Sequence, residues 1–236
     1  MRVKSSFEKP GIDWLARTYL RACRRELAYH AILSDIQIAS IYSDAIQTWS
    51  ASIEITSDRR TKIIFAFCSL VLATFRTVES KAGSSELGFD VASRAVAATL
   101  NLPTRLGIRF WLLRWSNPID RFKLGGLAAK LGDALGPSMS FEEHQRTDGL
   151  ELIVTSCGFR DFFAMHEELA LTKTICAYDH IWMNLMNVSK RNIFVNRGSA
   201  LSLGDENCQF VFSSSTNEAR PVDVVWLDAD VQRVAT

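Results

Sequence analysis

Three cysteines in the second half of the chain carry its strongest chemical signal. Cys157 ends a segment that reads as a strand, Cys176 lies three residues before Asp179, and Cys208 follows a turn. Residues three apart are neighbours on a helix, so Cys176 and Asp179 share a face if their segment is helical. A helix N-terminus or a nearby cation lowers a thiol pKa and favours the nucleophilic thiolate. The spacing therefore indicates a candidate catalytic thiol with an acid beside it.

Two other interpretations fit the same residues. A cysteine is often no more than a small buried hydrophobe. Cys, Asp and His also bind zinc, and His180 follows Asp179 directly, but the chain has no Cys-x-x-Cys pair. His166 begins half of a zinc-protease helix, yet alanine stands at position 170, where the second histidine is needed. We therefore predict no metal ligand and no cofactor.

The first part of the chain, to about residue 135, reads mostly as helix. Apolar residues recur at helical spacing over 12–50, as one long helix or two. Residues 62–79 read as a buried helix, because the apolar run 63–75 is shorter than the ~20 residues of a membrane span. A loop is expected over 81–86. A third helix over 89–100 should stop before Pro103, since the residue preceding proline avoids the helical region.

A basic and aromatic stretch follows over 105–136. It fits either a helix on a membrane surface or a core helix whose arginines reach out to water. Pro118 and the Gly125-Gly126 pair interrupt any long amphipathic face, which favours the core helix. Residues 136–149 are polar, contain proline and glycine, and are the best candidate boundary in the chain.

The second part alternates strands and helices. Strands are expected over 150–156, 192–196 and 207–213, and helices over 159–171 and 175–186, with a hairpin turn at 204–207. The predicted fold class is α+β, with a helical N-terminal part packed on a small, mainly antiparallel sheet formed by the C-terminal part. Residues 1–140 form the helical part, 148–214 the α/β part carrying the Cys/Asp/Arg constellation, and 215–236 a tail, within one compact unit.

The composition limits the class of protein. The 236 residues are 47% hydrophobic and 22% charged, as in ordinary globular chains, and the net charge of +1 disfavours a nucleic-acid binder. Five scattered cysteines are a poor disulfide framework, and the N-terminus lacks the apolar run of a secretory signal. We expect a reduced, cytoplasmic protein that acts on a small molecule and binds neither nucleic acid nor membrane, with homo-oligomerisation left open.

Residues 152–212 contain, in this order, a strand ending in Cys157, a segment with Cys176 and Asp179, a strand with Arg197, and a hairpin leading to Cys208. This arrangement resembles the bacterial L-2-amino-thiazoline-4-carboxylic acid hydrolase family. The family pattern is a strand ending in Cys, a helix, a Cys-x-x-Asp segment, an Arg-bearing strand and a Gly-Asp-x-x-Cys-x-Phe-x-Phe hairpin. The matching segments here are LIVTSC, TKTICAYDHIWM and FVNRGSALSLGDENCQFVF. The chain departs from the pattern at Gly158, usually Pro, at Gln209, usually an acid, and at Val188, usually the Pro of an Asn-Pro pair. These departures bear on the substrate more than on the fold.

The resemblance implies a hydrolase that opens a small cyclic amidine or amide by breaking a carbon–nitrogen bond. Such a reaction needs a nucleophile, a proton-transfer group and a cation for the substrate carboxylate. The implied catalytic residues are Cys176 or Cys208, as nucleophile or water-placing group, and Asp179, which moves protons or orients the amidinium. The implied substrate-binding residues are Arg197 for the carboxylate, Cys157 and His180.

Simpler explanations exist for two of these residues. Asp179 could be an ordinary acid near a helix start, and Arg197 a solvated strand residue. Two alternative functions also remain open on the same scaffold. One is a non-catalytic small-molecule binding domain, and the other is a metal-dependent enzyme of secondary metabolism.

Overall fold

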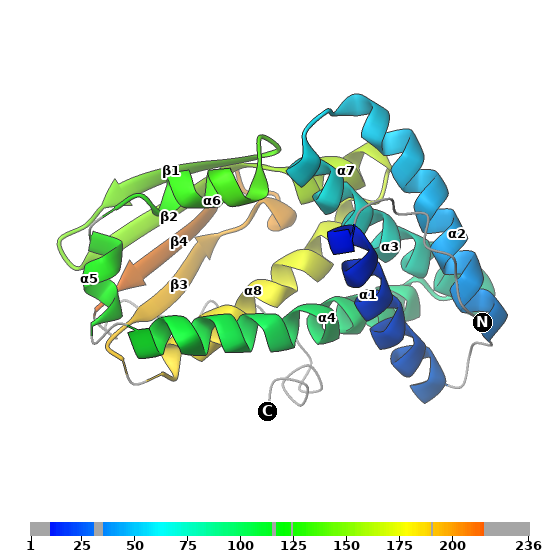
Figure 1. Cartoon of the computed structure of the whole chain (residues 1–236), viewed down its shortest axis with the longest axis horizontal. Coiled ribbons are helices and arrows are strands. Elements are labelled where there is room, and N and C mark those ends of the chain that lie inside the picture. Colours follow the sequence, from blue (N-terminus) through cyan, green and yellow to red (C-terminus); the bar gives the residue numbers. More distant parts are fainter. Residues whose placement is uncertain (1–9, 31–34, 115–116, 124, 190, 215–236) are drawn as a thin grey trace.

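The computed structural model of the chain describes residues 10–30, 35–114, 117–123, 125–189 and 191–214. A bundle of helices stands at one end and a four-stranded antiparallel sheet at the other (Figure 1). A long helix, α4, runs along both halves, with α8 lying between it and the sheet (Figure 1). The α+β fold class predicted from the sequence is confirmed. The predicted last strand after Pro221 lies outside the described residues.

The helical half is built around α3 (Arg59–Ala82), which contacts α1 (Pro10–Tyr29), α2 (Asp35–Ser52), α4 (Ser85–Arg114) and α7 (Gly158–Met165). The sequence left open one or two helices over 12–50, and the structure has two. A short 3-10 turn, η1 (Ile53–Ile55), links α2 to α3.

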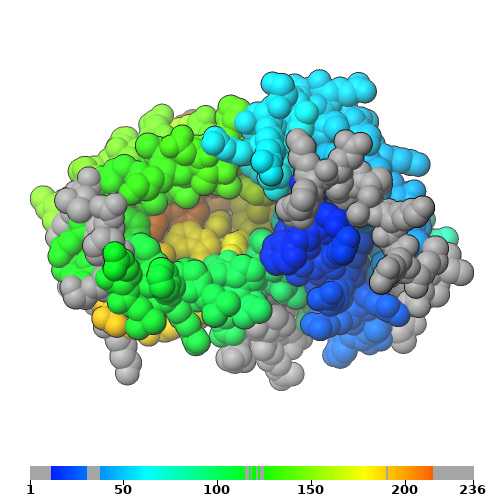
Figure 2. Space-filling view, in the orientation of Figure 1, coloured from blue at the N-terminus to red at the C-terminus, as the bar shows by residue number. Residues whose placement is uncertain are grey.

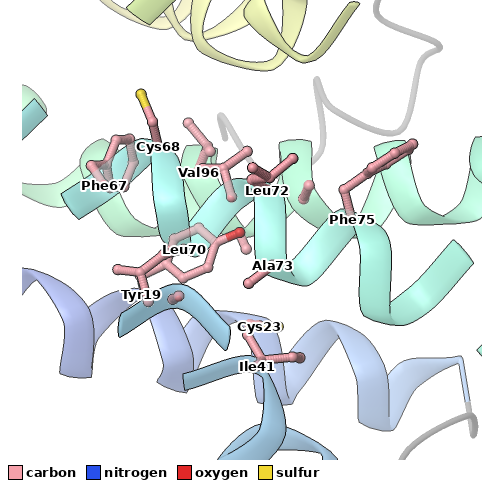
Figure 3. Packing of buried hydrophobic residues seen from close by; sticks show 14 of the residues in the cluster. Tyr19, Cys23, Ile41, Phe67, Cys68, Leu70, Leu72, Ala73, Phe75 and Val96 are labelled. Atoms are coloured by element: carbon pink, nitrogen blue, oxygen red, sulfur yellow. The ribbon is translucent and has the colours of Figure 1, made fainter. Parts of the chain in front are cut away.

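Helix α3 is buried, as its apolar run predicted. Asp58 caps its start by accepting a hydrogen bond from the Thr61 amide at 2.7 Å, and Gly83 ends it in the left-handed conformation. By length and apolar content α3 could cross a membrane, but 72% of its most apolar window is buried inside the protein. Tyr19 and Cys68 lie on opposite sides of α3 (Figure 3), so this helix is packed on more than one face. The pattern is that of a core helix.

Two sequence predictions around α4 were wrong. The loop expected over 81–86 is only Gly83-Ser84, because α3 continues to Ala82 and α4 begins at Ser85. Pro103 does not end the helix but lies inside α4. A proline inside a helix costs about 3 kcal/mol. The turns beyond it pack against α8 and bury Leu112 among the apolar residues of the sheet half, which offsets that cost.

The basic and aromatic stretch forms the end of α4, then α5 (Pro118–Lys123) and α6 (Leu127–Leu135). Pro118 and the Gly125-Gly126 pair separate these three helices, as expected. On α4 the apolar residues divide between two faces, with Trp111 and Leu112 packed inward and Phe110 and Leu113 exposed at 72% and 74%. The core interpretation therefore describes only the inner face.

The sheet has the strand order β1-β2-β4-β3, with every neighbouring pair antiparallel. Its strands are β1 (Met139–Gln145), β2 (Gly149–Cys157), β3 (Phe194–Ser199) and β4 (Cys208–Ser213). The predicted hairpin between the last two strands is confirmed, with the 3-10 turn η3 (Leu201–Leu203) and Gly204 at φ 96° inside its loop. The predicted boundary over 136–149 instead contains β1, an edge strand whose polar residues alternate outward.

Two helices complete the C-terminal part. The helix expected over 159–171 is α7 followed by a short 3-10 turn, η2 (Leu169–Leu171), because the chain turns at Glu167 with φ 61°. The helix expected over 175–186 is α8 (Thr172–Asn187). The buried residues form two clusters, one among the helices and one between the sheet, α4, α5 and α8.

Candidate functional site

A cavity of about 750 Å³ lies where the two buried clusters meet. Figure 2 shows the molecule hollowed at this place, between the green surfaces of α4 and α6, with yellow and orange segments at the bottom. Cys157, Cys176, Asp179 and Cys208 all line it. The structure thus brings together residues that are up to 51 positions apart in the sequence.

Regular secondary structure positions three of these side chains. Cys176 and Asp179 come from one face of α8, as their spacing predicted. Cys208, Phe210 and Phe212 alternate along β4 and all reach the cavity, which confirms their predicted common face. Helix α8 therefore carries Cys176 together with Asp179, and strand β4 carries Cys208, so these three side chains are held by regular secondary structure.

Cys157 occupies a different kind of position. It is the last residue of β2 and the N-cap of α7. Its side chain makes no capping hydrogen bond, but the nearby backbone N–H groups of Phe159 and Arg160 lower the pKa of its thiol. Burial has the larger effect and raises the pKa of Cys157 to about 11. Among the cavity thiols, Cys157 is the one at a helix N-terminus.

The other two cavity thiols also titrate high. Burial and the nearby Asp179 charge raise the pKa of Cys176 to about 12, although a hydrogen bond with Ser202 opposes this. Burial raises the pKa of Cys208 to about 11, although its sulfur accepts the Leu201 N–H at 3.2 Å. Both thiols are therefore protonated at neutral pH. None of the three cavity thiols has the lowered pKa that would activate a nucleophile.

Asp179 is held from two sides. The indole N–H of Trp182 donates to Oδ1 at 2.9 Å, and an Arg197 N–H donates to Oδ2 at 3.1 Å. Burial raises the pKa of Asp179, while the Arg197 charge opposes the rise. The side chain keeps 26% of its surface exposed, so the carboxylate is fixed in orientation yet accessible from the cavity.

Arg197 is buried behind this carboxylate. Its side chain is 3% exposed, and its position on β3 faces Phe210 of β4, which in turn faces Leu152 of β2. The same guanidinium donates to the Cys176 carbonyl at 3.2 Å. Arg197 is thus not a solvated strand residue, and it does not itself line the cavity. Its role as a ligand for a substrate carboxylate stays a prediction.

His180 completes the group behind the cavity wall. Its Nε2 lies 3.4 Å from an Arg197 nitrogen, and because a guanidinium carries only donors, the imidazole nitrogen accepts. Burial and the Arg197 charge lower the pKa of His180 to about 4, so the ring is neutral at pH 7. Within the described residues, no group of three or more His, Cys, Asp and Glu side chains is placed to hold a metal ion.

Sequence reasoning missed three residues of the site. Trp182 lies three residues after Asp179, and that spacing could have identified it as a partner. Ser202 bonds Cys176 from the β3–β4 loop, and Lys130 of α6 is the one basic side chain among the described residues lining the cavity. Neither has a sequence signal, because both reach the site through the tertiary fold.

Comparison with known proteins supports the resemblance seen in the sequence. Residues 113–212 match the family described as L-2-amino-thiazoline-4-carboxylic acid hydrolase. The matched segment contains nearly all of the sheet with α5, α6, α7 and α8, and so all four of the cysteine and aspartate residues that line the cavity. No curated protein and no solved structure matches the chain.

The structure accounts for two departures from the family's usual residues. Gly158 donates its N–H to the Met139 sulfur, and a Cβ at this position would lie 2.7 Å from the Ser138 side chain, so proline would lose the bond and collide. Gln209 donates its amide to Glu151 on the neighbouring strand, where an acid would be repelled. Gly158 and Gln209 thus each suit the residues that surround them in this protein.

Proposed function

With residues 113–212 assigned to the L-2-amino-thiazoline-4-carboxylic acid hydrolase family, we propose that this protein is a hydrolase that opens a cyclic amidine or amide by breaking a carbon–nitrogen bond. The observation that carries the proposal is the convergence of Cys157, Cys176, Cys208 and Asp179 on one cavity. A buried carboxylate among thiols is suited to a cationic amidinium, because it supplies both charge and hydrogen-bond acceptors in a medium of low dielectric constant.

Asp179 is the group that meets the amidinium. Its two oxygens are held by Trp182 and Arg197, so the remaining lone pairs have a fixed direction toward the cavity. Arg197 acts as a positioning residue, since its contacts go to Asp179, to the Cys176 carbonyl and to His180. An amidinium paired with Asp179 lies in the same cavity that Cys157, Cys176 and Cys208 line.

The reaction adds one water molecule. Its oxygen bonds to the amidine carbon, and one of its protons passes to the Asp179 carboxylate. The tetrahedral carbon then collapses to a carbonyl and the ring carbon–nitrogen bond breaks. Asp179 returns the first proton to the departing nitrogen and relays the remaining hydroxyl proton to the same nitrogen, which leaves as an ammonium group. The raised pKa values of Cys176 and Cys208 favour thiols that place the water by hydrogen bonding over thiols that attack as thiolates.

A direct assay tests the proposal. The purified full chain is incubated with L-2-amino-thiazoline-4-carboxylate. S-carbamoyl-cysteine, the product of ring carbon–nitrogen cleavage, is followed by chromatography and tandem mass spectrometry, which distinguish it from the N-carbamoyl isomer that carbon–sulfur cleavage would give. We expect turnover that falls at least about a hundredfold in Asp179→Asn, and that survives better in Cys176→Ser than in Cys176→Ala, because serine retains a water-placing group. Cys23→Ala is the control, since Cys23 is a cysteine buried in the helical core and does not line the cavity.

One observation favours a second candidate. The cavity thiols are protonated and the walls are mostly apolar, which is also what a non-catalytic binding domain would present. Folded wild-type protein that shows no turnover, yet binds the substrate at a site lost in Asp179→Asn, would establish that alternative.

A further inference from the structure

The cavity is much larger than a small ring acid requires. At about 750 Å³ it lies in the upper part of the range of ~300–1,000 Å³ that holds drug-sized ligands. An amino-substituted five-membered ring with one carboxylate fills only a fraction of this space. The remaining volume would be held by water against apolar walls, which is unfavourable.

Those walls are apolar in two different ways. At one end, aromatic rings pack together, with Phe122 stacked on Phe212 at 4.5 Å and tilted against Trp111 at 5.3 Å. Trp182 stacks on the same Phe212 ring at 6.2 Å. The residues that the helical half contributes to the lining are mainly aliphatic, such as Leu15, Ile63 and Leu100, with a few aromatic rings among them. The thiols and Asp179 belong to the same lining and are its polar part.

The charged residues of the lining also favour a ligand with a largely apolar body. Asp179 is the acidic side chain that lines the cavity and Lys130 the basic one, among the residues that the structure describes. Arg197, which could have received a substrate carboxylate, is buried and bonded to Asp179 and to the Cys176 carbonyl. A ligand with a cationic head and an uncharged apolar body fits this lining better than a small anion does.

We propose that the substrate of this site is a cyclic amidine or amide whose ring carries an extended apolar group, with the ring beside Asp179 and the apolar group along the walls of the cavity. This inference rests on the proposed function for its chemistry, but it makes a separate claim about binding. The apolar group can be an alkyl chain or an aryl system, and both bury apolar surface against the same residues.

Equilibrium binding tests the claim without turnover. The probes are n-alkyl amidines of increasing length, from butanamidine through octanamidine to dodecanamidine, with phenyl-substituted amidines as the aryl arm. Binding is followed by tryptophan fluorescence, because Trp111 and Trp182 line the cavity, and by calorimetry. We expect affinity to rise about fourfold per added methylene, equivalent to ~0.8 kcal/mol, until the cavity is full.

Substitutions at Ile108 distinguish binding inside this cavity from unspecific hydrophobic binding elsewhere on the protein. Ile108 lines the cavity from α4, whereas Leu106 is 59% exposed on the same helix and supplies the matched control. Ile108→Trp should weaken octanamidine binding about tenfold or more, while Leu106→Trp should leave it within about twofold. Ile108→Ala, which enlarges the cavity, should move the best chain length upward, a shift that mere loss of stability cannot produce.

Turnover of ring derivatives supplies the second readout. The free acid, the methyl amide and the octyl amide of L-2-amino-thiazoline-4-carboxylate are compared by kcat/KM. A preference for the octyl amide that disappears in Ile108→Trp supports the inference. Turnover of the free acid with no gain from chain length, together with amidine binding unaffected by Ile108→Trp, overturns it and leaves the hydrolase proposal standing. Ile108-dependent amidine binding without turnover of any derivative supports the ligand class and removes the hydrolase proposal.

Discussion

Arg197 of β3 and Asp179 of α8 form an ion pair across the wall of the cavity, with 3.1 Å between the guanidinium nitrogen and Oδ2. The arginine is almost inaccessible and the carboxylate faces the cavity. The pair thus links the sheet to the helix that carries Cys176, and it supplies the acidic side chain of a mostly apolar site.

Removal of this arginine should destabilise the protein. Arg197→Met leaves the Asp179 carboxylate without its cation in a buried site, and breaking a buried pair in this way costs ~3–5 kcal/mol. Urea denaturation at neutral pH measures the change. The control is Arg146→Met, which removes the ion pair with Asp148 near the surface and should cost at most about 1 kcal/mol. An Arg197→Met protein as stable as the control would contradict a structural role for the pair.

The acidic limb of the pH–rate profile should report Asp179. The carboxylate must be ionised to bind an amidinium, and burial raises its pKa from the ordinary value of 3.8. Activity should therefore fall on acidification at a higher pH than an ordinary aspartate would give. Acidification should have the opposite effect on stability. Because the pKa of Asp179 is raised in the folded state, the free-energy cost of burying its charge is present above that pKa and is relieved below it.

Kinetics of Asp179→Asn over the same pH range provide the check. The residual activity of this variant should lose the acidic limb, since asparagine does not titrate. An unchanged limb in a folded variant would assign the titration to another group. Parallel urea curves identify any part of the loss that comes from unfolding.

The cavity thiols should react slowly at neutral pH. Burial raises the pKa values of Cys157, Cys176 and Cys208 to about 11, 12 and 11, so little thiolate is present at pH 7. Alkylation by iodoacetamide, mapped by peptide mass spectrometry, should accelerate as the pH rises while the fold persists. Octanamidine should protect these thiols. Rapid alkylation of any of them at pH 7 would restore the activated-thiolate mechanism.

Gly158 should tolerate no side chain. A Cβ there would lie 2.7 Å from both Cβ and Oγ of Ser138, and overpacking of this kind costs about 1–3 kcal/mol. Thermal denaturation of Gly158→Ala measures the loss, and the double variant with Ser138→Gly should recover part of it. Gly132→Ala in α6 is the control, because nothing lies within 4 Å and alanine favours a helix by about 1 kcal/mol.

The local patterns of the chain predicted its elements well. The apolar run over 63–75 identified α3 as a buried helix, and alternation along 207–213 placed Cys208 in phase with Phe210 and Phe212. The three-residue spacing of Cys176 and Asp179 placed both on one face of α8. These features depend on helical and strand periodicity, which is a property of neighbouring residues and is therefore readable without the fold.

Local patterns did not predict the structure where contacts with distant segments determine it. Pro103 lies within α4 because the turns beyond it are held by α8, and β1 is a strand because it pairs with β2 despite its polar composition. Proline and polar residues are local signals of a break, but packing free energy gained across the fold outweighed them.

What the amino-acid sequence determined by itself is the α+β class, most of the helices and strands, and the resemblance of residues 113–212 to the L-2-amino-thiazoline-4-carboxylic acid hydrolase family. Tertiary structure alone decided that Arg197 is buried against Asp179, that the cavity thiols are protonated, and that Lys130 joins the lining. The reason is physical. Burial and charge pairing depend on which distant residues come together, and these two quantities set the pKa values and the shape of the site.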